Sequence, residues 1–247
     1  EYLGFFMGAL MLLYAAMLPS VPIGLRPLVV AGIVAMGLAN IVTFHRGAWF
    51  VTVMGFLVLL LRRRGKKAAY LAVTIAVVVT VLQLAPNLVT SLMGERFRLS
   101  FSANDVSFQD RKTLFLDVTL PAIAAHPLGE GIGTIGGAAM SLHRITGAST
   151  VVGLTESGYL STARQLGIPG LLIELVLHVL LLAASLRAIN KAATPWERSL
   201  VAGIAAVQVM FILGGFSDYP GELLPTNILF WLLSGLAVQI DLRSGPS

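Results

Sequence analysis

Long apolar runs separated by short breaks decide what this chain can fold into. A helix needs roughly 20 apolar residues to cross the hydrocarbon core of a bilayer. Charged residues make up only 12% of the chain, whereas an ordinary soluble domain has about a quarter. The sequence therefore predicts an all-α polytopic membrane protein that forms a single transmembrane domain over residues 1–247. We expect about seven transmembrane helices, over residues 2–18, 28–44, 48–61, 68–85, 168–186, 200–215 and 227–240.

The basic residues predict the direction in which these helices run. Residues 62–67 (R-R-R-G-K-K) form a dense basic turn between two apolar runs, and such turns stay in the cytoplasm. Alternation from this turn puts the longest polar stretch, residues 88–166, on the extracytoplasmic side, and puts Arg187 and Lys191 inside. Within this large extracytoplasmic loop, the apolar spacing of residues 109–124 predicts a short helix at the membrane surface.

Three further features narrow the class of protein. Basic cytoplasmic turns explain the net charge of +5, so we expect no nucleic-acid partner. The chain has no cysteine, which excludes disulfides and thiolate chemistry. It begins at Glu1 directly before an apolar run, from which we expect the C-terminal part of a longer protein.

Arginines gather in the extracytoplasmic loop at Arg96, Arg98, Arg111 and Arg164. A guanidinium grips a planar anion through two parallel hydrogen bonds, so this cluster is typical of a phosphate or diphosphate site. The alternative is pairing with carboxylates of the same loop, and loop composition alone favours that alternative. Arg46 lies where two apolar runs meet, and it either snorkels to the interface or points into a cavity at the membrane edge.

Acidic and histidine side chains form a second set of candidates. Glu156 suits a general base at the membrane face, although the residue alone is better explained as a helix N-terminal carboxylate. Glu174 and His178 stand four residues apart in one apolar run, which suits either a proton relay or a buried structural pair. The spacing of His126 and His143 matches no metal-ligand motif, so we expect no metal.

A glycine-rich segment, residues 131–136 (G-I-G-T-I-G), matches the dinucleotide-binding fingerprint. No βαβ unit surrounds it, and we therefore discount nucleotide binding. The glycines instead predict a tightly bent loop that comes close to a ligand.

Three ordered blocks of sequence carry a family resemblance. Residues 43–48 (T-F-H-R-G-A) look like an apolar-T-x-S-R-G-A block, with His45 in place of serine. Residues 109–111 (Q-D-R) and 125–133 (A-H-P-L-G-E-G-I-G) look like a G-R block followed by H-P-L-x-G-x-G. Residues 156–160 (E-S-G-Y-L) and 166–171 (L-G-I-P-G-L) look like H-N-x-Y-L followed by x-G-I-P-G-L. Taken together, they resemble the bacterial O-antigen ligase and O-antigen polymerase family.

This resemblance implies an enzyme rather than a passive membrane protein. Members of the family are polytopic glycosyltransferases that act on glycans linked to undecaprenyl diphosphate. The resemblance implies that Arg46 and Arg111 hold the donor diphosphate and that Glu156, which replaces the histidine of ligases, activates the acceptor. Residues implied to bind substrate are Arg96, Arg98, His126, Glu130, Tyr159 and Arg164.

The resemblance also implies which cofactors and partners the reaction needs. Undecaprenyl diphosphate is already a good leaving group, so the transfer requires neither a nucleotide sugar nor, in principle, a metal or other cofactor. The expected partners are the lipid-linked glycan donor, a glycan acceptor, the bilayer and other glycan-assembly proteins. We expect a multi-pass protein of the bacterial inner membrane, with a polymerase favoured over a ligase because Glu156 departs from the ligase pattern. The alternatives are an O-antigen ligase and a proton-coupled transporter using Glu174 and His178.

Overall fold

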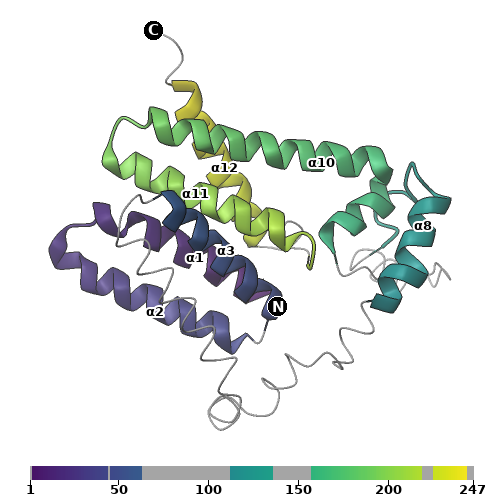
Figure 1. Cartoon of the computed structure of the whole chain (residues 1–247), viewed down its shortest axis with the longest axis horizontal. Coiled ribbons are helices and arrows are strands. Elements are labelled where there is room, and N and C mark those ends of the chain that lie inside the picture. The colour runs from purple at the N-terminus through teal and green to yellow at the C-terminus, as the bar shows by residue number, and fades with distance from the viewer. Residues whose placement is uncertain (1, 44, 63–111, 136–156, 219–224, 244–247) are drawn as a thin grey trace.

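The structure is a computed structural model that describes residues 2–43, 45–62, 112–135, 157–218 and 225–243 (Figure 1). Within these ranges the chain is all-helical and contains no sheet. The α-helices are α1 (Tyr2–Met17), α2 (Arg26–Val42), α3 (Arg46–Arg62), α8 (Leu120–Ala125), α10 (Gly158–Lys191), α11 (Pro195–Gly214) and α12 (Thr226–Arg243). The short turns η1 (Leu18–Ser20) and η2 (Ile23–Leu25) join α1 to α2, and the π-helical η3 (Leu114–Thr119) leads into α8.

Several helices have the length and composition of membrane spans. Among the described residues these are Leu3–Ser20, Ile23–Val42, Gly158–Lys191 and Pro195–Gly214, and α3 adds the shorter apolar segment Gly47–Leu60. The prediction of an all-α polytopic membrane protein is therefore confirmed at this level. Six of the predicted apolar runs coincide with α1, α2, α3, α10, α11 and α12, whereas the run at residues 68–85 lies outside the described part of the chain.

Helix α11 is the centre of the bundle and packs against α1, α3, α10 and α12 (Figure 1). Its Val201, Ile204 and Val207 are completely buried. Small residues bring the helices close together: a Cβ added to Gly203 would meet the Cβ of Ala16 at 3.0 Å. Helices in membranes associate through such small residues, because lipid tails are as apolar as leucine and burial of apolar surface gives little driving force.

Helices α2 and α10 present apolar side chains outward. Val34 and Leu38 on α2 and Ile173 and Val179 on α10 are all exposed. Leaving such surface in water is unfavourable by about 25 cal/mol per Å². Acyl chains remove this cost, so these faces suit contact with lipid.

The two ends of the bundle are formed by different parts of the chain. At one end, here called the basic end, lie Arg26, Arg187, Lys191, Arg198 and Arg243. Asp241 is paired there with Arg187 at 2.9 Å and with Lys191 at 2.8 Å. The opposite end, here called the motif end, holds the start of α3, the start of α10 and the last turn of α11. Arg46 and Arg164 lie at the motif end, so both ends of the bundle carry arginines.

The predicted surface helix is present, although its bounds and form differ from the prediction. It runs from Lys112 through η3 and α8 to Ala125, and its first part is wound as a π-helix. Helix α8 packs against α10 at the motif end, where Figure 1 shows it beside the bent end of that helix. Its position at the membrane surface stays a prediction.

Candidate active site

Helix α10 bends sharply at Gly167, at the boundary between the predicted loop and the predicted span. Gly167 has φ 73° and ψ −175°, a combination that is essentially restricted to glycine. The sequence predicted a span that begins only at residue 168, whereas a helical segment already extends from Gly158 to the bend. Pro169 follows in the first turn after the bend, where its missing N–H removes no helical hydrogen bond.

The segment after α8, residues 126–135, docks onto this bend and is here called the docked segment. The backbone N–H groups of Glu130 and Gly131 donate to the carbonyls of Arg164 and Gln165 at 2.7 and 3.1 Å, and Ile168 N–H donates to Pro127 O at 2.9 Å. The two backbones touch so closely that a Cβ on Gly167 would collide with Leu128. Of the glycines predicted to bend tightly at residues 131–136, Gly131 and Gly133 have positive φ, 108° and 78°, and their approach to a ligand stays a prediction.

Two of the predicted substrate-binding residues meet at this contact. Arg164 Nη2 donates to both carboxylate oxygens of Glu130, at 3.0 and 2.7 Å. The Arg164 side chain is 6% exposed and that of Glu130 is 20% exposed. For these two residues the pairing alternative is therefore what the structure shows. Arg164 nevertheless keeps Nε and Nη1 buried without a partner among the described residues, and its role toward substrate stays a prediction.

At the motif end, contacts join the start of α3, the start of α10 and the turn after α11. His45, which precedes α3, contacts through Nε2 the carboxylate of Asp218, which follows α11. The Asp218 carbonyl accepts from Gly158 N–H at 2.8 Å, and the Ser157 hydroxyl donates to Gly215 O at 2.8 Å. The first and third sequence blocks are thereby joined through the end of α11.

Ser157 is the N-cap of α10 and accepts a hydrogen bond from Leu160 N–H. Glu156, the predicted base, is the preceding residue and so stands before the cap rather than providing it. Its own placement lies outside the described residues, as do those of Arg96, Arg98, Arg111 and His143. The backbone of Arg46 begins α3, but its side chain is likewise outside the described part. His126 ends α8 and is exposed.

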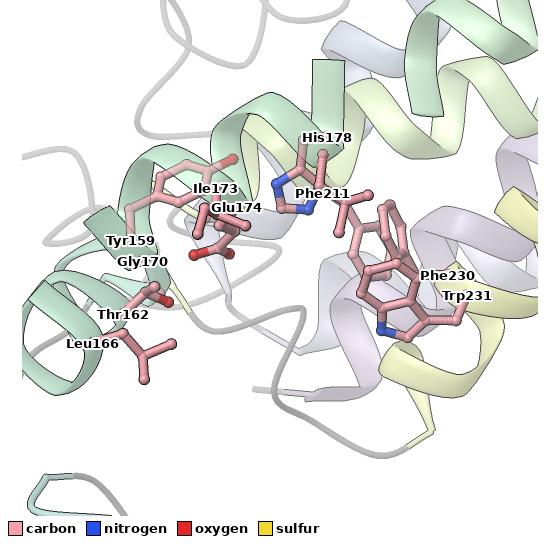
Figure 2. Close-up of a pocket in the computed structure, with 13 residues that line it drawn as sticks. Tyr159, Thr162, Leu166, Gly170, Ile173, Glu174, His178, Phe211, Phe230 and Trp231 are labelled. Atoms are coloured by element: carbon pink, nitrogen blue, oxygen red, sulfur yellow. The ribbon is translucent and has the colours of Figure 1, made fainter. Parts of the chain in front are cut away.

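A cavity of about 330 Å³ lies between α10, α11 and α12 (Figure 2). Its lining includes Tyr159, Glu174 and His178 from α10 and Phe230 and Trp231 from α12. The Tyr159 hydroxyl, predicted to bind substrate, donates to Ile212 O at 2.8 Å. The cavity is therefore mainly apolar and aromatic, with one carboxylate and one imidazole in its wall.

Glu174 and His178 do not satisfy each other as the buried-pair interpretation expected. No ion pair between them occurs among the described residues, and Glu174 Oε2 and His178 Nδ1 are each buried there without a partner. The imidazole instead packs edge-on against the rings of Tyr159 and Phe230, with ring centroids 6.1 and 5.4 Å apart. No group of three metal-ligating side chains is found in the described ranges.

Comparison with known families decides the class of this protein. The family model for O-antigen ligases matches residues 31–175, which is more than half of the chain. The chain belongs to the O-antigen ligase family. No curated protein matches it. The matched range contains all three blocks of the resemblance, so the predicted family is confirmed.

Membership in the O-antigen ligase family makes this protein a membrane glycosyltransferase of the ligase and polymerase type, with a lipid-linked glycan as the class of substrate. Its family membership and its apolar helices of membrane length make it a multi-pass membrane protein. Sequence reasoning missed the pairing of His45 with Asp218. The available signal was the histidine that stands at a serine position of the first block.

Proposed function

We propose that this protein transfers oligosaccharide units from undecaprenyl diphosphate to a glycan hydroxyl at the extracytoplasmic face of the bacterial inner membrane. The observation that carries the proposal is the meeting of the three family blocks at one end of the bundle. The first block reaches α10 through His45 and Asp218, and the second reaches it through Glu130 and Arg164. Such convergence is what a transfer reaction between two substrates needs.

The chemistry follows from the charges at that end. Arg46 begins α3, and Arg111 directly precedes the helical segment that leads to the docked segment. Guanidinium groups there stabilise the charge that builds on the diphosphate as the anomeric bond breaks. A base removes the proton of the acceptor hydroxyl, and a single displacement inverts the anomeric centre. The diphosphate is a sufficient leaving group, so the reaction proceeds without a nucleotide sugar or a metal.

We favour a polymerase, in which the acceptor is another lipid-linked glycan. The supporting observation is Glu156, which stands where ligases of the family carry histidine. On the family pattern alone, Glu156 is the residue implied to act as the base. The ligase alternative differs only in the acceptor and uses the same donor site.

The test is glycan transfer by the purified protein in liposomes supplied with lipid-linked repeat units. Arg46→Ala is expected to abolish most of the transfer. Arg46→Lys should fail nearly as badly, because lysine keeps the charge but loses the planar fork. Arg111→Ala and Arg111→Lys should behave in the same way.

Arg198→Ala provides the matched control, because Arg198 is an exposed arginine at the basic end. This variant should transfer glycan at the wild-type rate. Normal product lengths from Arg46→Ala and Arg111→Ala would contradict the assigned donor site. Transfer to a non-glycan acceptor, with no polymer formed, would replace the polymerase with the ligase.

A further inference from the structure

His45 and Asp218 form a dyad at the motif end, outside the residues assigned so far, in which His45 Nε2 contacts the Asp218 carboxylate. Their side chains are only 10% and 11% exposed. The His45 ring packs against Phe5, with centroids 5.3 Å apart. Close by, the start of α3 lies against the turn after α11, because a Cβ on Gly47 would meet Ser217 Oγ at 3.0 Å. The imidazole is thus held between three elements of the bundle.

The dyad determines which nitrogen of the imidazole is able to accept a proton. Nε2 faces the Asp218 carboxylate, so in the neutral ring the hydrogen resides on Nε2 and Nδ1 carries the lone pair. Nδ1 is buried and has no partner among the described residues. A buried acceptor without a donor is costly, and buried polar groups in proteins are nearly always bonded. A substrate hydroxyl that donates to Nδ1 would remove this cost.

The position of the dyad suits a role in the transfer. Arg46, the proposed donor-binding residue, follows His45 directly in the chain. Asp218 also holds the first residue of α10, Gly158, through its carbonyl. The dyad therefore lies between the block that binds the leaving group and the helix that carries Tyr159 and Arg164.

We propose that His45 is the general base of the transfer and that Asp218 is its positioning residue. This inference rests on the proposed glycan transfer. Nδ1 takes the proton of the acceptor hydroxyl while the oxygen of that hydroxyl bonds to the anomeric carbon of the donor glycan. The bond from that carbon to the diphosphate breaks, and the electron pair leaves with the diphosphate. Asp218 stabilises the imidazolium so formed, and the proton then passes to solvent.

The experiment measures transfer of lipid-linked repeat units by the full-length protein in liposomes. In His45→Gln the side-chain amide still donates to Asp218, so the fold is kept while the base is lost. We expect kcat to fall about a hundred- to ten-thousandfold, the usual contribution of a general base. The KM for the donor should stay within about twofold, since the leaving-group site is intact.

Asp218→Asn should lower kcat with unchanged donor KM. Its matched control is Asp241→Asn, which removes a carboxylate of similar exposure that is paired at the basic end. This control should lose stability but keep kcat. In His45→Ala, added imidazole should restore part of the rate, a response that a purely structural histidine does not give.

The outcomes distinguish a failure of the proposed glycan transfer from a failure of the assignment of His45 as its base. If the wild-type protein transfers no glycan, the proposed function falls and the base assignment falls with it. If the wild type is active and His45→Gln matches it, only the dyad is refuted. Loss of activity in Glu156→Gln, together with no imidazole rescue of His45→Ala, would return the base role to Glu156.

Discussion

The contact between Gly167 and the docked segment provides a sharp test of how the active site is built. We consider Gly167→Ala, with Gly133→Ala as its matched control. Both glycines have positive φ, 73° and 78°, so both alanines carry a backbone strain of about 1–3 kcal/mol. A Cβ on Gly133 meets no atom within 4 Å, whereas a Cβ on Gly167 collides with the backbone of Leu128. The difference between the two variants therefore reports the collision together with the added strain of the Gly167 backbone, whose ψ is −175°.

The magnitude follows from the hydrogen bonds that the collision breaks. Three backbone bonds join the docked segment to the bend, through Glu130, Gly131 and Ile168. At about 0.5–1.5 kcal/mol each, their loss weakens docking by roughly 1.5–4.5 kcal/mol. A value of about 3 kcal/mol corresponds to roughly a hundredfold change in the opening equilibrium.

The assay uses the absence of native cysteines. Ile135, at the end of the docked segment, is 3% exposed, so the thiol of an Ile135→Cys variant reacts only when the segment opens. Adding Gly167→Ala should accelerate thiol labelling roughly a hundredfold, and adding Gly133→Ala should change it much less. A cysteine introduced at the fully buried Ile204 of α11 should stay protected in both cases. Equal labelling rates for the two glycine variants would refute the docking argument.

Two further predictions concern carboxylates on the long helices. Hydrogen bonds from Lys191, and then from Arg187, hold the pKa of Asp241 below its ordinary value, although burial opposes them. The interaction of Asp241 with these two basic residues should therefore stabilise the fold above about pH 4. This stabilisation is lost as the pH falls through the lowered pKa of Asp241. Asp241→Asn should therefore reduce the fall of the unfolding temperature below about pH 4. An unchanged fall would show that these interactions do not contribute to stability. Glu174→Met should stabilise the protein by about 1–3 kcal/mol in chemical unfolding, because it removes a buried carboxylate oxygen without a described partner. A loss of stability would show that this oxygen has a partner beyond the described residues.

Hydropathy was sufficient to predict the described transmembrane helices but not the bend within α10. Apolar runs of membrane length have few alternatives in a bilayer, because every backbone polar group must be bonded internally. The L-G-I-P-G sequence around Gly167 looked like a helix start, since glycine and proline usually interrupt helices. The structure instead bends one long helix there, and the bend is stabilised by Pro127 and Leu128, which lie about forty residues earlier in the chain.

The site residues were predictable as a list and not as an arrangement. Glu130 was chosen from its sequence block and Arg164 from the arginines of the loop, but their pairing depends on glycine backbones that allow two segments to touch. The partner of His45 was harder to predict, because Asp218 is 173 positions away and belongs to no recognised block. Only the antiparallel packing of α3 and α11 brings the two side chains together.

The short helical segment between Gly158 and the bend is the frame on which the motif end is assembled. Its first residue is held by the Asp218 carbonyl, and its last turn is held by Glu130 and Gly131. The dyad and the docked segment are therefore fastened to opposite ends of one rigid piece. A change of angle at Gly167 would move this piece and both of its attachments relative to the rest of α10 without breaking a helix. For this reason a backbone substitution at the bend should lower the rate of transfer even though Gly167 contributes no chemical group to it.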